Sequence, residues 1–182
     1  MIDNINTQLT IRDKTYQVNW NLQQVNILVG DNGSGKTRLL EQISYCTDST
    51  ILNLPFELFV NPDDILFSDG KLPLNLIDLY EKLTDEWISS NFKSSDYKLL
   101  SKGRKYLIDL LSSIYYCYPN STVLIDDVGQ NLDLGTQQKL LDFLVEQRPD
   151  LQFIVTTHSP SIFGKNFGNN VTFINNILTE IL

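Results

Sequence analysis

The feature that most constrains the fold of this chain is a glycine-rich turn between an apolar segment and a helix-like one. The apolar segment VNILV (residues 25–29) leads directly into GDNGSGKT (residues 30–37), which fits the pattern G-x-x-x-x-G-K-[ST] at each fixed position. Glycines let backbone N–H groups approach phosphate oxygens closely, and the helix that follows directs the positive end of its dipole at the same anion. The sequence therefore predicts a strand, a phosphate-binding loop and a helix in succession.

The residue types in and beyond this loop suit a nucleoside triphosphate bound with Mg²⁺. Lys36 is expected to neutralise the β- and γ-phosphates, and the Thr37 hydroxyl is expected to ligate Mg²⁺. A second apolar run, TVLI (residues 122–125), ends at a pair of acids. Asp126 is expected to complete the magnesium shell, and Asp127 to polarise an attacking water. The predicted nucleotide-binding residues of the loop are Asn32, Gly33, Ser34, Gly35, Lys36, Thr37 and Arg38.

Apolar patterning along the chain predicts an α/β fold. Residues 6–12 and 15–21 alternate apolar and polar side chains around a short turn, as a β-hairpin does. Short apolar runs, typical of buried parallel strands, occupy residues 25–29, 122–126, 151–157 and 171–175. Helical spacing occupies residues 37–45, 103–118 and 136–147. We therefore expect a P-loop NTPase fold with a mainly parallel sheet, an antiparallel N-terminal edge and a small helical insertion.

The composition of the chain changes in its middle third. Residues 62–98 contain two prolines, many acids and the helix-like segment LNLIDLYEKLTDEWI. We expect residues 62–118 to form a helical insertion, and residues 1–61 together with 119–182 to form the nucleotide-binding core.

Length and charge limit the classes of protein that this chain can represent. Its 182 residues suit one domain, and its net charge of -8 argues against a surface that binds nucleic acid over its whole extent. The first residues do not resemble a signal peptide, and no apolar segment is long enough to cross a membrane. Cys46 and Cys117 lie far apart without metal-ligand spacing, which favours reduced thiols in a cytoplasmic protein that has no membrane partner.

Three further segments accompany the loop and the paired acids in a characteristic order. LSKGR (residues 100–104) opens an amphipathic helix, VGQNLD (128–133) follows the acids, and TTHSP (156–160) ends a strand. These segments resemble the signature, the D-loop and the H-switch of ABC-type ATPases. Their form is similar to that of soluble, AAA-family members of the chromosome-maintenance, DNA-repair and overcoming-lysogenization-defect groups.

The resemblance implies ATP and Mg²⁺ as ligands and a homodimer with ATP at its interface. It implies that His158 contacts the γ-phosphate or the attacking water, and that Ser101 and Gly103 bind the ATP of the other subunit. Ser101 also suits a simple helix N-cap. Tyr16 would stack on adenine, although its spacing suits a place in the core somewhat better. The family has glutamate where this chain has Asp127; because displacing a base by about an ångström can cost on the order of 100-fold in rate, we expect slow hydrolysis.

The partner of such a dimer is expected to be a separate effector protein, such as a nuclease in DNA repair or phage defence, since the segment after His158 is too short for a nuclease domain. A basic cluster suits either a contact with DNA phosphates or an acidic partner, or simply a solvated surface. The cluster consists of Lys93, Lys98, Lys102, Arg104 and Lys105.

Three other classes of protein stay open. The first is the ATP-binding subunit of an ABC transporter, although no glutamine between Ser44 and Gly129 supplies the family's Q-loop and Asn61 is only a substitute. A small P-loop kinase shares only the phosphate-binding loop. A nucleotide-binding scaffold without hydrolysis is supported by Asp127 alone.

Overall fold

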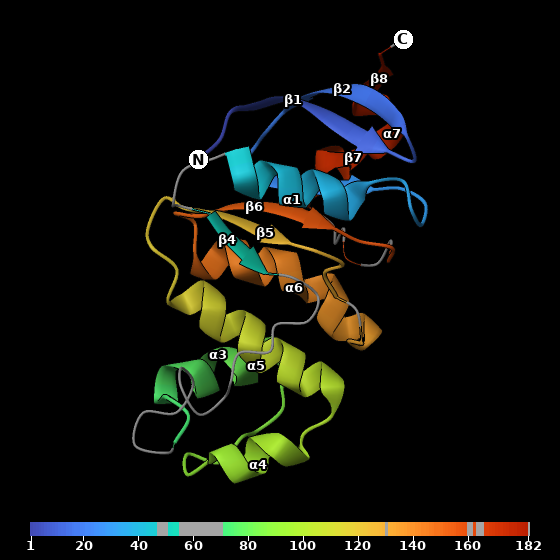
Figure 1. Ribbon diagram of the computed structural model, residues 1–182. Coiled ribbons are helices and arrows are strands. Elements are labelled where there is room, and N and C mark those ends of the chain that lie inside the picture. The colour runs from blue at the N-terminus through green and yellow to red at the C-terminus, as the bar shows by residue number, and fades with distance from the viewer. Residues whose placement is uncertain (47–50, 55–70, 130, 160–161, 163–165, 182) are drawn as a thin grey trace.

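Two sheets and their helices form a stack of layers (Figure 1). The computed structural model describes residues 1–46, 51–54, 71–129, 131–159, 162 and 166–181. A five-stranded parallel sheet has the order β4-β5-β6-β3-β7, and a three-stranded antiparallel sheet has the order β1-β2-β8. Helix α1 lies between the sheets, and α6, α5, α3 and α4 lie on the opposite side of the parallel sheet (Figure 1). The predicted fold class is confirmed.

The elements follow the predicted order closely. The strands are β1 (Asn4–Ile11), β2 (Lys14–Asn21), β3 (Val25–Val29), β4 (Ile51–Leu54), β5 (Thr122–Ile125), β6 (Gln152–Thr156), β7 (Val171–Phe173) and β8 (Leu178–Glu180). The helices are α1 (Lys36–Cys46), α3 (Leu74–Thr84), α4 (Ser94–Leu99), α5 (Lys102–Tyr115), α6 (Leu134–Gln147) and the short α7 (Ile174–Ile177). Sequence patterning missed α7 and β8, because elements of three or four residues carry too little periodicity to be recognised.

The three central parallel strands, β3, β5 and β6, are buried on both faces, which explains their largely apolar sequence. Successive strand residues point to opposite faces, so neighbours on β5 enter different cores. Val123 joins the core beneath α5 and α6, whereas Leu124 joins the core around α1 and the hairpin. On β3, Ile27 and Leu28 divide in the same way.

The described part of the predicted helical insertion shares the core of the parallel sheet. Tyr80 of α3 and Leu107 of α5 are almost fully buried and belong to the same cluster as Val123 of β5. The boundaries predicted for the insertion stay predictions, and Asn61 lies outside the described residues.

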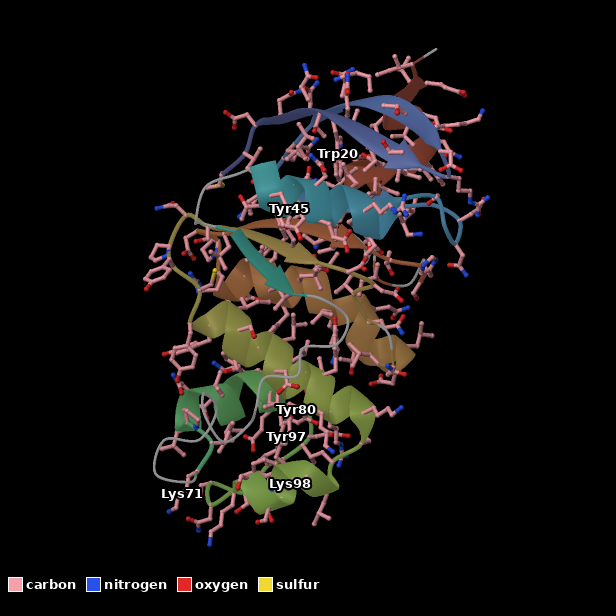
Figure 2. The ribbon with its side chains drawn as sticks, viewed as in Figure 1. Trp20, Tyr45, Lys71, Tyr80, Tyr97 and Lys98 are labelled. Carbon is pink, nitrogen blue, oxygen red and sulfur yellow. The ribbon has the colours of Figure 1, made fainter. Side chains whose placement is uncertain are left out.

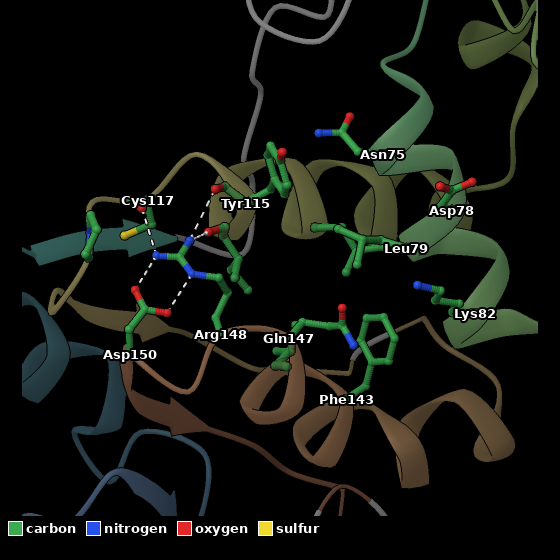
Figure 3. A pocket seen from close by; sticks show the side chains of 14 residues that line it. Asn75, Asp78, Leu79, Lys82, Tyr115, Cys117, Phe143, Gln147, Arg148 and Asp150 are labelled. Carbon is green, nitrogen blue, oxygen red and sulfur yellow. Dashed lines mark hydrogen bonds and ion pairs between the residues drawn. The ribbon is translucent and has the colours of Figure 1, made fainter.

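Arg148 holds the C-terminal end of α5 at the edge of a cavity of about 540 Å³ between α3, α5 and α6 (Figure 3). Its guanidinium donates to the carbonyl oxygens of Ile114, Tyr115 and Cys117, the last at 3.0 Å. It also makes a two-pronged ion pair with Asp150 at 2.8 and 2.7 Å. The cation therefore supplies hydrogen bonds to carbonyls at the end of a helix, where helical partners run out, although the Ile114 oxygen also accepts from the Cys117 N–H at 3.2 Å.

We predict that Arg148→Ala lowers the free energy of unfolding by about 2–4 kcal/mol, because it strands the α5 carbonyls and the Asp150 carboxylate. Urea unfolding at neutral pH measures the loss. The matched control is Lys139→Ala, since Lys139 pairs with Asp85 at 2.8 Å but both side chains are more than half exposed. That exposed pair should contribute at most about 1 kcal/mol. Equal losses in the two variants would contradict the role of Arg148.

Helix α4 is attached to α5 through a buried pair, with Tyr97 lying between the helices (Figure 2). The Tyr97 hydroxyl lies 2.7 Å from both carboxylate oxygens of Asp109. Burial raises the pKa of Asp109 to about 6, and the Tyr97 hydrogen bond and the charge of Lys105 only partly oppose that effect.

The raised pKa of Asp109 predicts a pH dependence of stability. From the ordinary value of 3.8 up to about 6, the folded chain holds a proton here that the unfolded chain has lost, so this contribution to stability falls as pH rises. Asp109→Asn should therefore become more stable relative to the wild type between about pH 4 and pH 7, by about 1–3 kcal/mol. Thermal or urea unfolding at several pH values measures the difference. Tyr97→Phe keeps the acid but removes a hydrogen bond that lowers its pKa, so it should extend the loss of stability to higher pH. A flat difference for Asp109→Asn would refute the assignment.

Candidate functional site

The carboxyl ends of three neighbouring strands build the candidate site. The phosphate-binding loop follows β3, the paired acids follow β5, and His158 lies just beyond β6. Because β5, β6 and β3 are adjacent and parallel, these segments meet at one edge of the sheet. They enclose a cavity of about 660 Å³, lined by Ile11, Arg12, Asn32, Gly33, Gly35, Lys36, Thr37, Arg38, Asp126, Asp127 and His158.

The loop conformation requires glycine at two positions. Gly33 and Gly35 have φ values of 74° and 100°, which side-chain-bearing residues rarely adopt. A Cβ on Gly35 would also collide with Ile11 at the end of the first hairpin strand. The hairpin therefore packs directly against the loop, and α1 begins at Lys36 with its free N–H groups at the same place.

Lys36 is buried and donates to carbonyl oxygens of its own loop. Its Nζ lies 2.7 Å from the Gly30 oxygen and 3.0 Å from the Asp31 oxygen. Burial lowers the pKa of Lys36, whereas the carboxylates of Asp126, Asp127 and Asp31 favour its charged form. The ammonium is thus held at the floor of the loop, in reach of a bound phosphate.

The chemistry of the nearby oxygens fits Mg²⁺. Thr37 Oγ1 donates to Asp126 Oδ2 at 2.7 Å, and Thr156 Oγ1 donates to the other oxygen of the same carboxylate. Mg²⁺ prefers oxygen ligands and is commonly held by one or two protein groups together with substrate phosphates. Thr37 and Asp126 are the residues that would hold it, and the ion would neutralise charge on the phosphates.

Asp127 adopts an unusual backbone conformation that turns the chain away from β5. Its φ is 50°, in the left-handed region that Asp tolerates better than most residues. Its N–H donates to Thr156 Oγ1 at 2.7 Å, so a single hydroxyl on β6 orders both acids. Asp127 lines the cavity, as a residue that orients water must.

His158 is exposed to the cavity, and the residues on both sides of it are tied down. Thr157 Oγ1 donates to the Val128 oxygen at 3.2 Å, and Ser159 Oγ donates to Gln137 Oε1 at 2.6 Å. The backbone that carries the imidazole is therefore attached to the segment after the paired acids.

Four of the predicted site residues do not line this cavity, namely Ser34, Tyr16, Ser101 and Gly103. Ser34 Oγ is buried, has no hydrogen-bond partner among the described residues, and would lie 2.9 Å from a Cβ on Gly30. A hydroxyl of this kind inside the loop could donate to a phosphate oxygen. Tyr16, half-buried on β2, pairs with Leu9 in the hairpin, and its role at adenine stays a prediction.

Ser101 and Gly103 line a second cavity of about 500 Å³, bounded by α3, α5 and the start of α6. Ser101 caps α5 by accepting a hydrogen bond from the Arg104 N–H at 3.4 Å. A Cβ on Gly103 would collide with the Asn131 carbonyl oxygen, so glycine lets α5 touch the loop after the paired acids. The second cavity is lined also by Leu132 and by residues of the helix that follows.

Only part of the basic cluster is available to an anionic partner. Arg104 pairs with Glu86 at 2.8 Å. Lys105 donates to the Lys98 oxygen at 2.9 Å and lies 5.8 Å from the centre of the Tyr97 ring. The exposed ammonium of Lys98 lies at the end of the molecule away from the hairpin (Figure 2).

Sequence reasoning missed Arg12, Thr156 and Gln137. Arg12 sits in the hairpin turn with φ 47°, and its Nη2 would lie 2.8 Å from a Cβ on Gly33. No local pattern marks this residue, since only the packing of the hairpin on the loop brings it to the cavity. Thr156 and Gln137 act through hydrogen bonds that sequence spacing does not reveal.

The fold is that of ATP-binding cassettes. The chain is similar to the ADP conformation of an ATP-binding cassette of an ABC transporter, with a TM-score of 0.59 and 14% identity over 94% of this chain and 85% of that one. It is also similar to cbiO1 of Clostridium perfringens, part of the ABC transporter complex cbiONQ, with a TM-score of 0.56 and 19% identity over 86% and 78% of the two chains. At these identities the likeness establishes the fold alone.

Sequence relatives narrow the class. Residues 75–164 match a family profile described as "AAA domain, putative AbiEii toxin, Type IV TA system". The chain is 30% identical over 125 residues to the Retron Ec83 probable ATPase of Escherichia coli. This match covers 60% of this chain but only 21% of the length of that relative. With the phosphate-binding loop and the fold, these matches show a P-loop protein of the ATPase type that is related to ABC-type, AAA-family ATPases. Among the described residues, no helix has the length and apolar character to span a membrane.

We predict that Arg12→Ala weakens the binding of ATP about tenfold, because it removes a cation that lies over Gly33 at the cavity mouth. Titration of a fluorescent ATP analogue measures the dissociation constant. Lys14→Ala is the matched control, since Lys14 belongs to the same hairpin but pairs with Glu180 at 2.9 Å. The prediction is wrong if both variants bind ATP as the wild type does.

Proposed function

We propose that this chain binds ATP with Mg²⁺, dimerises around two ATP molecules, hydrolyses them slowly and thereby regulates a separate effector protein. The observation that carries the proposal is the separation of two cavities in one chain. One contains the phosphate-binding loop, the paired acids and His158, and the other contains Ser101 and Gly103. Each cavity supplies half of a nucleotide site, and a second copy of the chain would supply the complementary half.

The roles proposed for the residues follow from where they lie. Lys36 and the N-terminus of α1 would bind the phosphates. Asp127 would accept a proton from the attacking water, and His158 would donate a hydrogen bond to the γ-phosphate or to that water. Aspartate is one methylene shorter than glutamate, so the water would be held less closely and turnover would be low.

The sequence relatives favour an effector partner over a membrane transporter. The matched family description names a toxin of a toxin–antitoxin system, and the relative at 30% identity is a retron ATPase. The effector, for instance a nuclease of DNA repair or phage defence, would bind or respond to the dimer and not to the monomer. A contact with DNA would use Lys93, Lys98 and Lys102, which are exposed. We place the protein in the cytoplasm.

The ATP-binding subunit of an ABC transporter is the second candidate, since the solved structures of similar fold belong to such transporters. Co-purification of the native protein with an integral membrane protein would favour this candidate over the first.

We predict that Asp127→Asn, which cannot activate water well but keeps the fold, forms a dimer in ATP and Mg²⁺ and is monomeric without nucleotide. Sedimentation or light scattering during gel filtration measures the mass. Adding Ser101→Arg to that variant should prevent the dimer, because a large cation would fill the second cavity, while ATP binding to each monomer persists.

The matched control is Ser95→Arg in the same background, because Ser95 is an exposed serine of α4 that does not line either cavity. It should leave the ATP-dependent dimer intact. A protein that binds ATP and stays monomeric across a wide range of concentrations would refute the proposed dimer.

A further inference from the structure

A single glutamine connects the surroundings of the two cavities without lining either. Gln137 lies in the first turn of α6 and is half-buried. Its Nε2 donates to the Gly129 oxygen at 3.0 Å and to the Leu132 oxygen at 2.9 Å. Its Oε1 accepts from Ser159 Oγ at 2.6 Å. Both amide protons and the amide oxygen are therefore used, which leaves this side chain one orientation.

The ends of this connection belong to different cavities. Leu132, whose carbonyl accepts from Gln137, lines the second cavity together with Ser101 and Gly103. Ser159, which donates to Gln137, follows His158 directly, and His158 lines the nucleotide cavity. A displacement of Leu132 would therefore shift Gln137, and Gln137 is the hydrogen-bond partner of Ser159, the residue beside His158.

The loop at the second cavity has a conformation that its neighbours must maintain. Asp127 and Asn131 both have positive φ, at 50° and 64°, which costs a residue with a side chain on the order of 1 kcal/mol. The Gly129 oxygen accepts from both Gln137 and the Leu132 N–H. Strained backbone of this kind persists only because of the contacts around it, so a new contact at the second cavity would compete with the hydrogen bonds from Gln137.

We propose that Gln137 and Ser159 are positioning residues that make the placement of His158 depend on the backbone of Gly129 and Leu132. Occupation of the second cavity by a partner's nucleotide would then change the placement of the His158 imidazole in the same subunit. This inference deepens the proposed function and rests on it, because it concerns how the two half-sites of one chain communicate.

Ser159→Ala is the sharpest variant for a test. It removes the hydroxyl that joins the His158 segment to Gln137, and it leaves the Gln137 bonds to the loop in place. We expect kcat to fall roughly tenfold, whereas the dissociation constant for ATP changes less than about threefold. Gln138→Ala is the matched control, because Gln138 is the exposed neighbour of Gln137 and lines neither cavity. It should behave as the wild type.

A double-mutant cycle with His158→Ala separates positioning from an independent effect. If Ser159 acts through the imidazole, then adding Ser159→Ala to His158→Ala causes no further loss of kcat. An equal fold-loss in both backgrounds would overturn the inference, because Ser159 would then act by another route.

His158 is the only histidine of the sequence, so its imidazole can be observed by NMR without ambiguity and without turnover. Titration with a non-hydrolysable ATP analogue and Mg²⁺ should shift and sharpen this signal in the wild type and in Gln138→Ala. In Ser159→Ala and Gln137→Leu the signal should stay broad, as expected for an imidazole that is no longer held. Identical spectra in all four proteins would overturn the inference.

The two proposals can fail separately. A wild type that binds ATP without hydrolysing it would refute the proposed activity, while the NMR titration would still decide whether Gln137 and Ser159 position His158. A wild type that turns over ATP, with Ser159→Ala equal to it in kcat and in spectrum, would refute the positioning role alone.

Discussion

The hydroxyl of Thr156 is the contact on which the candidate site depends. It donates to one oxygen of Asp126 and accepts from the N–H of Asp127, while Thr37 donates to the other Asp126 oxygen. Through these bonds the ends of β5 and β6 and the first turn of α1 are fixed to one another. The acids are therefore oriented by the protein itself, and in the proposed function little reorganisation would be needed for the reaction.

The sheet and the phosphate-binding loop could be predicted from the sequence because each has a local cause. Strands buried on both faces must be continuously apolar, and a loop that wraps a phosphate must place glycine where φ is positive. Arg12 could not be predicted, since it reaches the cavity only because a Cβ-free Gly35 lets the hairpin pack on the loop. Gln137 was missed for a similar reason, since the three hydrogen bonds of its amide depend on how α6 is placed against Gly129, Leu132 and Ser159.

The two cavities are built from different kinds of structural element. The cavity beside the phosphate-binding loop lies at the ends of adjacent parallel strands. The second cavity lies between helices and beside Asn131, whose φ is positive. In the function proposed above, the residues that carry out chemistry would be placed by the sheet, and the residues that recognise a second copy would be placed by the helices.

Neighbouring residues of β5 pack into different cores, and this limits where the length of the chain can change. Val123 faces the helices and Leu124 faces α1, so losing or gaining one residue in the strand would send each side chain to the wrong layer. Such a change would cost much of the stability of both cores and would also displace Asp126. The alternation of β5 therefore fixes where the acids lie along the strand, and we expect an added or deleted residue to be tolerated better in the connections between elements than in β5.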